Sequence, residues 1–466
     1  MSPTPTPSSP TGVDKQRTVD KQRTDAKYSR TVKWTVALAT LAILFDGYDL
    51  VVYGTILPLL MDDPGQLGNI SAGQAGMLGS YALIGVMVGA LVNGAIGDYL
   101  GRRRLMLVNI VWFSAGMAMA AMATSVEMFA VLRFVTGIGI GGLLATTAAL
   151  VAEVVPAAKK NLYNAIVYSG VPAGGILASV LAIALRDVIG WRGLFWIGAL
   201  PVVLLLPLAL AKLPESPRWL VSRGRLDDAA RVHAATGIPL PSEADLDAER
   251  DVTKVGFAAL ATRRYALGTA LLGVMSFVGL MLTYGLTTWL PKIMQDAGYN
   301  AKGSLLFLVV LNGGAVLGTI IASRIADRRG PQRVVATTFG LAALSLILFT
   351  MGFPITVLLA LVAVAGTGTI GTQVLIYGFV SNYYSTSARA AGVAWCAGFG
   401  RLGGIFGPII GGAIVAAGLS NSVTFYIFAG VAIVGMVVTL LVPHARSQSA
   451  ATGPAPAAVP AVPATA

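Results

Sequence analysis

Two acidic residues, Asp46 and Asp49, lie inside an apolar stretch near the start of the chain, in the segment F-D-G-Y-D-L. A charged side chain at the centre of a membrane-spanning helix costs about 2.5–3.5 kcal/mol on insertion scales, so it is expected only where it has a task. A spacing of three residues places both acids on one helix face, which Tyr53 continues. Two close carboxylates repel each other when both are charged, which suits a group that takes up and releases a proton. We therefore predict a proton-coupling role for both; the alternative is pairing with basic residues for packing alone.

Three further charged residues fall in or beside apolar stretches, namely Arg133, Glu153 and Arg401. An arginine in lipid is costly, so each should face an interior cavity or a charged partner. Arg401, in G-F-G-R-L-G-G, is our candidate for binding a substrate carboxylate, because a guanidinium binds a carboxylate through two parallel hydrogen bonds. An ion pair with Asp46 or Asp49 is the structural alternative. Glu153 is grouped with the proton-coupling residues, with a role at the membrane surface left open.

Aromatic side chains within the apolar stretches could line a slot for a ring-shaped substrate. Those that could supply it are Tyr81, Tyr168, Tyr284, Trp289, Tyr377 and Trp395, and Tyr53 joins them from the acidic face. As candidate substrate-binding residues we select Trp289, Tyr53, Tyr81, Tyr284 and Tyr377 beside Arg401. Taken singly, each could instead face lipid or lie in the aromatic belt at the membrane interface.

The elements that must hold these residues are membrane-spanning helices. Of the 466 residues, 55% are hydrophobic and 12% are charged, whereas a soluble domain carries about 25% charged residues. A spanning helix needs about twenty apolar residues. On this criterion we expect twelve spans, near 34–60, 73–97, 104–123, 126–148, 159–185, 191–212, 264–290, 301–326, 333–352, 354–380, 387–416 and 421–443. The fold class is therefore an all-α membrane protein.

The polar segments divide this series into two sets of six helices. We expect a disordered basic tail over 1–33, helical bundles over 34–212 and 264–443, a middle loop over 213–263, and a disordered tail over 444–466. Basic residues concentrate in the tail, the middle loop and alternate connections. The other connections hold only Arg186, Arg192, Lys292 and Lys302. By the positive-inside rule, both termini are cytoplasmic. The formal charge of +12 is thus a sign of topology and does not indicate nucleic-acid binding.

An internal repeat supports the two halves. G-A-I-G-D-Y-L-G-R-R-R starts at Gly94, and S-R-I-A-D-R-R-G-P-Q-R starts at Ser323, six helices later. Glycine permits close helix approach or a tight turn, and an Asp can meet a helix N-terminus or an Arg. We expect these loops to hold one conformation of a transport cycle and to release in the other; the alternative is a basic loop that only obeys the topology rule. The predicted gating residues are Gly94, Asp98, Gly101, Arg102, Asp327 and Gly330.

The first copy resembles the signature loop G-x-x-x-D-x-x-G-R-R/K of the major facilitator superfamily. Further resemblances are R-F-V-T-G-I-G-I-G-G from Arg133, S-G-V-P-A-G-G around Pro172 and P-E-S-P-R-W-L from Pro214, so that the likeness covers about residues 34–443. It implies the major facilitator fold, with two pseudo-symmetric six-helix bundles. It also implies that Arg133 occupies a position linked to proton transfer beside the first helix.

The D-G-x-D element of the first span resembles the hallmark of the aromatic acid:proton symporter family within that superfamily. This resemblance implies a substrate such as benzoate, a hydroxybenzoate, protocatechuate or gentisate, imported with a proton into a bacterium. It implies that Trp289 lies where residues affect substrate choice, and that Arg389 contributes to gating.

The function predicted is secondary active import of an aromatic carboxylate by proton symport through alternating access, in the bacterial inner membrane. The alternatives are a major facilitator transporter of a sugar or dicarboxylate, or a drug:proton antiporter. One cysteine and two histidines provide no basis for a metal site, and no nucleophile with its base is visible, so we expect neither an enzyme nor a cofactor other than the proton. We expect a monomer in the lipid bilayer, without a nucleic-acid partner.

Overall fold

The computed structural model describes residues 12–156, 159–242 and 258–443. Residues 1–11 of the predicted N-terminal tail, the whole predicted C-terminal tail 444–466 and residues 243–257 of the middle loop lie outside this description. Within the described ranges the elements are helices. The first half contains α1 (Gly12–Asp62), α2 (Ala72–Leu100), α3 (Arg102–Ala121), α4 (Val126–Val154), α5 (Lys160–Tyr168), α6 (Gly170–Gly198) and α7 (Pro201–Lys212). The middle loop contains α8 (Pro217–Ser222) and α9 (Leu226–Thr236).

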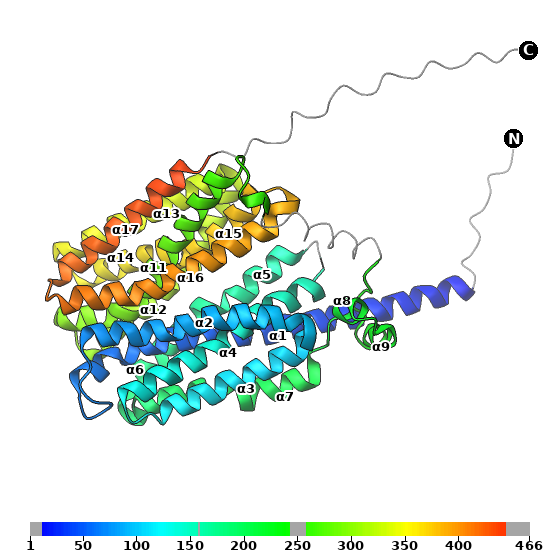
Figure 1. Cartoon of the computed structure of the whole chain (residues 1–466), viewed down its shortest axis with the longest axis horizontal. Helices are drawn as coiled ribbons and strands as arrows, with labels where there is room; N and C mark the ends of the chain where they lie inside the picture. Colours follow the sequence, from blue (N-terminus) through cyan, green and yellow to red (C-terminus); the bar gives the residue numbers. More distant parts are fainter. Residues whose placement is uncertain (1–11, 157–158, 243–257, 444–466) are drawn as a thin grey trace, which may run out of the picture.

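The second half repeats this plan. It contains α11 (Ala266–Asp296), α12 (Ala301–Arg329), α13 (Pro331–Leu348), α14 (Ile355–Gly366), α15 (Thr372–Tyr383), α16 (Thr386–Ala416) and α17 (Asn421–Leu441). A short 3-10 turn (Phe349–Met351) follows α13, and a π-helical turn (Thr367–Gly371) joins α14 to α15. Figure 1 shows the two halves as separate bundles lying side by side, with α8 and α9 beside the start of α1.

Twelve membrane crossings account for the helices described. Eleven helical segments are long and apolar enough to cross a membrane, and one of them, Leu162–Lys212, has 51 residues. At about 1.5 Å per residue a straight helix of that length would measure about 75 Å, more than twice the about 30 Å of a hydrocarbon core. Gly190 has a positive φ of 66° inside α6 and reverses the chain there. The long segment therefore holds two crossings, and the predicted series of twelve is recovered.

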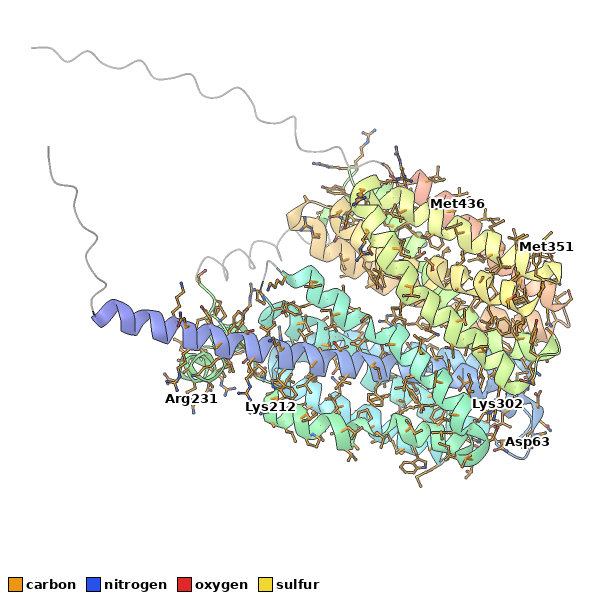
Figure 2. All side chains as sticks on the ribbon, turned by 180° about the vertical axis from the view of Figure 1, so that it is seen from behind. Asp63, Lys212, Arg231, Lys302, Met351 and Met436 are labelled. Carbon is orange, nitrogen blue, oxygen red and sulfur yellow. The ribbon has the colours of Figure 1, made fainter. Side chains whose placement is uncertain are left out.

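The two halves contact each other towards one end and draw apart towards the end that carries α9 (Figure 1). Ser80 of α2 donates a hydrogen bond of 2.6 Å to the carbonyl of Ile405 in α16. Two ion pairs also join the halves, Lys292 with Asp62 at 2.8 Å and Lys302 with Asp187 at 3.1 Å. Figure 2 shows Asp63 and Lys302 at this end, and Lys212 and Arg231 at the other. We call the end with Asp63 and Lys302 the opposite end, and the end with Lys212 and Arg231 the α9 end.

The repeated loops form the same turn in both halves. Gly101 separates α2 from α3 with a φ of 90°, and Gly330 separates α12 from α13 with a φ of 88°. A residue with a side chain is strained at such positive φ values, whereas glycine is not. The spacing predicted from the sequence thus corresponds to a shared backbone geometry, which supports the internal repeat.

The start of α1 differs from the expectation of a disordered tail, because residues 12–33 are helical and continuous with the first span. Two contacts of α1 with α9 support this extension. Lys27 donates to the carbonyl of Ala234 at 2.9 Å, and the hydroxyl of Thr31 donates to the backbone carbonyl of Thr236 at 3.1 Å. The middle loop therefore packs on the first helix, a long-range contact that composition does not reveal.

Candidate functional site

Asp49 of α1 and Arg133 of α4 form a buried ion pair inside the first half. Arg133 Nη1 donates to Asp49 Oδ1 at 2.5 Å, and the two residues are 1% and 0% exposed. The guanidinium also lies over the ring of Tyr53, 5.4 Å from its centroid. Asp49 Oδ2 and Arg133 Nε have no hydrogen-bond partner among the described residues. A buried pair of this kind is costly to desolvate, and the loss of either partner leaves an uncompensated charge.

Asp46 lies one turn earlier on α1 and has different surroundings. It is 2% exposed, and its Oδ1 has no hydrogen-bond partner in the part of the chain described. The charge that attracts it comes from the other half of the protein, from Arg401 of α16. A buried carboxylate without a hydrogen-bond donor is unfavourable when charged. Asp46 is therefore a buried acid without a hydrogen bond to its Oδ1, and it lies within electrostatic range of Arg401.

Arg401 lies in a cluster that both halves build. It interacts electrostatically with Asp46 of α1, Tyr168 of α5, Tyr284 of α11 and Tyr377 of α15. Arg401 and the three tyrosines are half-buried. The cluster presents one cation among three aromatic rings with polar tips, which complements a molecule that carries a carboxylate on an aromatic ring.

Local backbone features position the members of this Arg401 cluster. Gly404 follows Arg401 by one turn, and a side chain there would meet the ring of Tyr284, with the Cβ 2.7 Å from it. The π-helical turn 367–371 precedes α15, where the hydroxyl of Thr372 bonds to the carbonyl of Thr367 at 3.1 Å. Such turns insert one extra residue and rotate the helix that follows, and they are frequent at functional sites. The turn thereby sets the face of α15 that carries Tyr377.

Not all of the predicted aromatic residues join the Arg401 cluster. Trp289 is fully buried between α11 and α16, where its indole N–H donates to the carbonyl of Pro408 at 2.9 Å. Tyr53 is also buried, and its hydroxyl donates to the carbonyl of Ala75 at 2.5 Å. Tyr81 is half-buried on α2. Tyr168, which we did not select from the sequence although it lies in a span, belongs to the cluster, because it interacts electrostatically with Tyr377 and Arg401.

Glu153 lies with the predicted gating loop, residues 94–104, at the α9 end, apart from Asp46 and Asp49. Its Oε1 accepts a hydrogen bond of 3.1 Å from Arg102 Nε, and Arg102 Nη1 also donates to the carbonyl of Gly97. Glu215 of the middle loop accepts from the backbone N–H groups of Arg102 and Arg103 at 2.9 and 3.0 Å. An anion at the start of a helix stabilises it through the unpaired N–H groups and the helix dipole. Glu215 therefore holds the start of α3, a contact that the sequence prediction missed.

The remaining gating candidates make few contacts in this conformation. The side chain of Asp98 lies outside the described part of the chain. A side chain added at Gly94 would meet open space, so the predicted close helix approach is not made here. Asp327 and Arg389 are exposed at the α9 end. The separation of the halves at this end accounts for these open positions.

Comparisons with known proteins give one consistent result. A model of the Major Facilitator Superfamily matches residues 39–351 and 303–465. The chain is 33% identical to the benzoate transport protein of Acinetobacter baylyi, over 93% of this chain and 94% of that protein. It is 32% identical to the gentisate transporter of Corynebacterium glutamicum, over 83% and 82%. It is also 32% identical to the gallate transporter of Pseudomonas putida, over 91% and 95%. In structure it is similar to the xylose transporter XylE of E. coli, with a TM-score of 0.70 at 20% identity, covering 90% of this chain and 99% of that one.

Proposed function

The chain belongs to the Major Facilitator Superfamily and is a multi-pass membrane transporter, and from this premise we propose that it carries an aromatic carboxylate together with a proton. The relatives named above as benzoate, gentisate and gallate transporters support the substrate class. The observation that carries the proposal is the Arg401 cluster, in which one guanidinium from the second half lies within electrostatic range of Asp46 from the first half and of three tyrosines.

Coupling follows from competition for Arg401. When Asp46 is charged, it attracts the guanidinium that the substrate carboxylate needs. Protonation of Asp46 removes this competitor, so that a substrate carboxylate can take its place beside Arg401. Substrate and proton then bind together, which is the condition for symport. A monovalent anion that moves with one proton adds no net charge, and each pH unit across the membrane supplies about 1.4 kcal/mol per proton.

Asp49 and Arg133 support this site from inside the first half. Their ion pair lies one turn from Asp46 on α1, and the charge of Asp49 disfavours a second charge on Asp46. Arg133 offsets the charge of Asp49 and lets it persist in a buried position. In this scheme Asp46 takes up the transported proton, and the ion pair sets the electrostatic environment in which it does so.

Alternating access is the movement that the architecture favours. We propose that the halves rock about the Arg401 cluster, and that the conformation described here releases its ligands at the α9 end, where the halves draw apart. We assign this end to the cytoplasm, because Arg102, Lys212 and Arg231 lie there and basic residues favour the inner face. Cytoplasmic termini follow from this assignment, and the bacterial organisms of the relatives named above support a bacterial inner membrane.

Uptake by proteoliposomes tests the proposal. The purified protein is reconstituted, and radiolabelled benzoate, 4-hydroxybenzoate, gentisate and xylose are offered at an outside pH one unit below the inside pH. We expect accumulation of at least one aromatic acid, its collapse with a protonophore, and no accumulation of xylose. Accumulation that survives the protonophore would contradict coupling, and accumulation of xylose alone would contradict the substrate class.

A further inference from the structure

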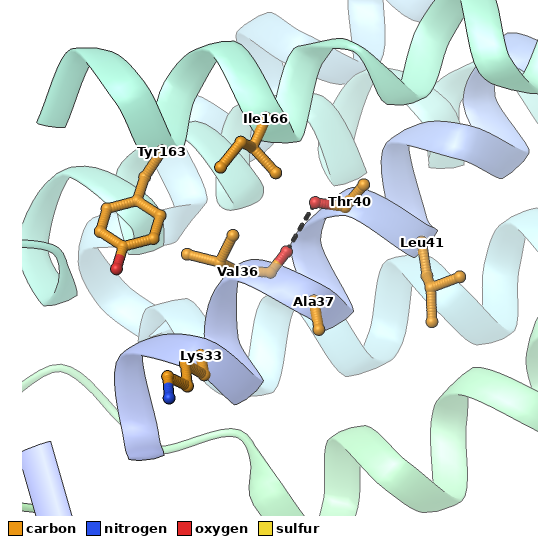
Figure 3. Close-up of a pocket in the computed structure, with 7 residues that line it drawn as sticks. All are labelled: Lys33, Val36, Ala37, Thr40, Leu41, Tyr163 and Ile166. Carbon is orange, nitrogen blue, oxygen red and sulfur yellow. Dashed lines mark hydrogen bonds between the residues drawn. The ribbon is translucent and has the colours of Figure 1, made fainter. Parts of the chain in front are cut away.

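A groove between α1 and α5 lies apart from the Arg401 cluster. It has a volume of about 440 Å³ and is lined by residues of these two helices (Figure 3). Figure 2 shows α1 at the face of the molecule on this side, next to α5. Leu41 and Ile166, which line the groove, are each 41% exposed. Exposed apolar side chains on a membrane-spanning helix face lipid, so the groove opens to the hydrocarbon of the bilayer.

The two ends of the groove differ in polarity. Lys33 and Tyr163 lie at one end, and the side chains of Val36, Ala37 and Leu41 follow along α1 (Figure 3). Thr40 also lines this wall, but its hydroxyl is bonded to the carbonyl of Val36 at 2.8 Å. The wall therefore offers no free polar group beyond its first turn, and the groove has the amphipathic pattern of a lipid molecule.

The length of the groove is close to the hydrocarbon thickness of one leaflet. Lys33 and Leu41 are eight residues apart, which is about 12 Å along a helix. One leaflet contributes about 15 Å of hydrocarbon, half of the core. Lys33 immediately precedes the apolar part of α1, at the level where lysine side chains reach the headgroups.

Charge at the polar end favours an anion. Lys33 is exposed, the lining residues include no acid, and Lys159 and Lys160 stand at the start of α5. Cations near the inner surface attract anionic headgroups. We propose that this groove binds one anionic phospholipid, with its phosphate between Lys33 and the hydroxyl of Tyr163 and an acyl chain along Val36, Ala37 and Ile166.

A lipid at this site would act on the transport machinery through α5. This helix has nine residues and continues through Ser169, which keeps right-handed helical φ and ψ, into α6. Its last residue, Tyr168, belongs to the Arg401 cluster. A bound acyl chain between α1 and α5 fixes the position of α5 and with it one wall of the cluster. The binding site itself does not depend on the proposed substrate, whereas this effect on transport does.

Native mass spectrometry of the purified full chain tests the site. The protein is titrated with phosphatidylglycerol and with phosphatidylcholine of identical acyl chains. We expect one phosphatidylglycerol to bind about tenfold more tightly than phosphatidylcholine. Lys33→Gln should weaken the binding of phosphatidylglycerol about fivefold. Ala37→Trp should abolish the binding of both lipids, because the larger side chain fills the groove. Lys21→Gln, on the same helix, and Leu317→Trp, at an exposed position of α12, are the matched controls and should bind as the wild type.

Two outcomes would overturn the proposal. One is equal binding of both lipids by the wild type, which would mean ordinary solvation by lipid. The other is unchanged phosphatidylglycerol binding in Lys33→Gln together with Ala37→Trp. Ile166→Trp fills the same groove from α5 and replaces Ala37→Trp if that variant does not fold. Because lipid binding is measured without transport, the result is independent of the uptake assay that tests the proposed function.

Discussion

Asp46 of α1 and Arg401 of α16 interact electrostatically across the junction between the two halves. The two residues are 355 positions apart in the 466-residue chain, so no local sequence pattern relates them. Asp49, three residues after Asp46, pairs instead with Arg133 of its own half. The two acids thus share a helix face but belong to different charge clusters. This division places one acid at the junction between the halves and the other in an ion pair within the first half, and the predictions below separate the two roles.

Asp46→Asn should remove proton coupling while leaving substrate binding. The amide keeps the shape of the acid but carries no charge and takes up no proton, so Arg401 stays available to the substrate. We expect that uphill accumulation is lost and that exchange of labelled for unlabelled substrate at equal concentrations persists. Both are measured in proteoliposomes. Accumulation at the wild-type level would exclude Asp46 as the coupling residue.

Asp49→Asn should destabilise the protein, because it leaves Arg133 buried without a counter-charge. Removal of one partner of a buried ion pair costs about 3–5 kcal/mol. A thermal unfolding assay in detergent should show a lower midpoint for Asp49→Asn and for Arg133→Leu. The double variant Asp49→Leu with Arg133→Leu should recover much of the loss. If the double variant is no more stable than the single ones, the pair is not coupled as described.

Arg401→Lys should weaken substrate binding more than it slows transport. Lysine keeps the positive charge but cannot form two parallel hydrogen bonds to a carboxylate. A charged hydrogen bond contributes about 1.5–3 kcal/mol, which corresponds to an increase of about 10- to 100-fold in KM. Initial uptake rates over a range of substrate concentrations measure it. Arg23→Lys, at an exposed position of α1 before the first span, is the control and should leave KM unchanged.

Lys292→Gln should favour opening at the opposite end. Lys292 bonds both Asp62 of the first half and Asp296 of its own helix, so its loss removes one link between the halves. A partly exposed pair contributes about 1 kcal/mol or less, a shift of up to about fivefold in the conformational equilibrium. Distances between spin labels at Asp63→Cys and Leu419→Cys report this equilibrium. An unchanged distance distribution would show that this pair does not hold the halves.

Glu215→Ala should loosen the start of α3. Glu215 accepts two backbone N–H groups there, and the loss of such a cap costs about 0.5–2 kcal/mol. Hydrogen exchange should quicken at Arg102 and Arg103. Glu215→Asp, whose shorter side chain keeps the charge, should lie between Ala and the wild type. Unaltered protection in Glu215→Ala would contradict the capping role.

Local patterns were sufficient for the helices, the two halves and the turns between them. Runs of apolar residues predicted each crossing, and equal spacing of Gly101 and Gly330 in the two repeats predicted a shared turn that the backbone has. These features depend on residues within one or two turns of each other, because helix formation, turn geometry and membrane insertion are local or compositional properties. Asp46, Asp49 and Arg401 were recognised as candidate site residues because each is a charged residue within a local run of apolar residues.

Partner choice depended on the packing of helices distant in the chain. Nothing local distinguishes Asp46 from Asp49, and only the positions of α4 and α16 direct them to Arg133 and Arg401. The sequence predicted Trp289 as a substrate-binding residue, whereas in the structure its indole N–H donates a hydrogen bond to the carbonyl of Pro408. A side chain's sequence context states what it can bind, whereas the groups within hydrogen-bonding or Coulombic range are set by how the whole bundle closes.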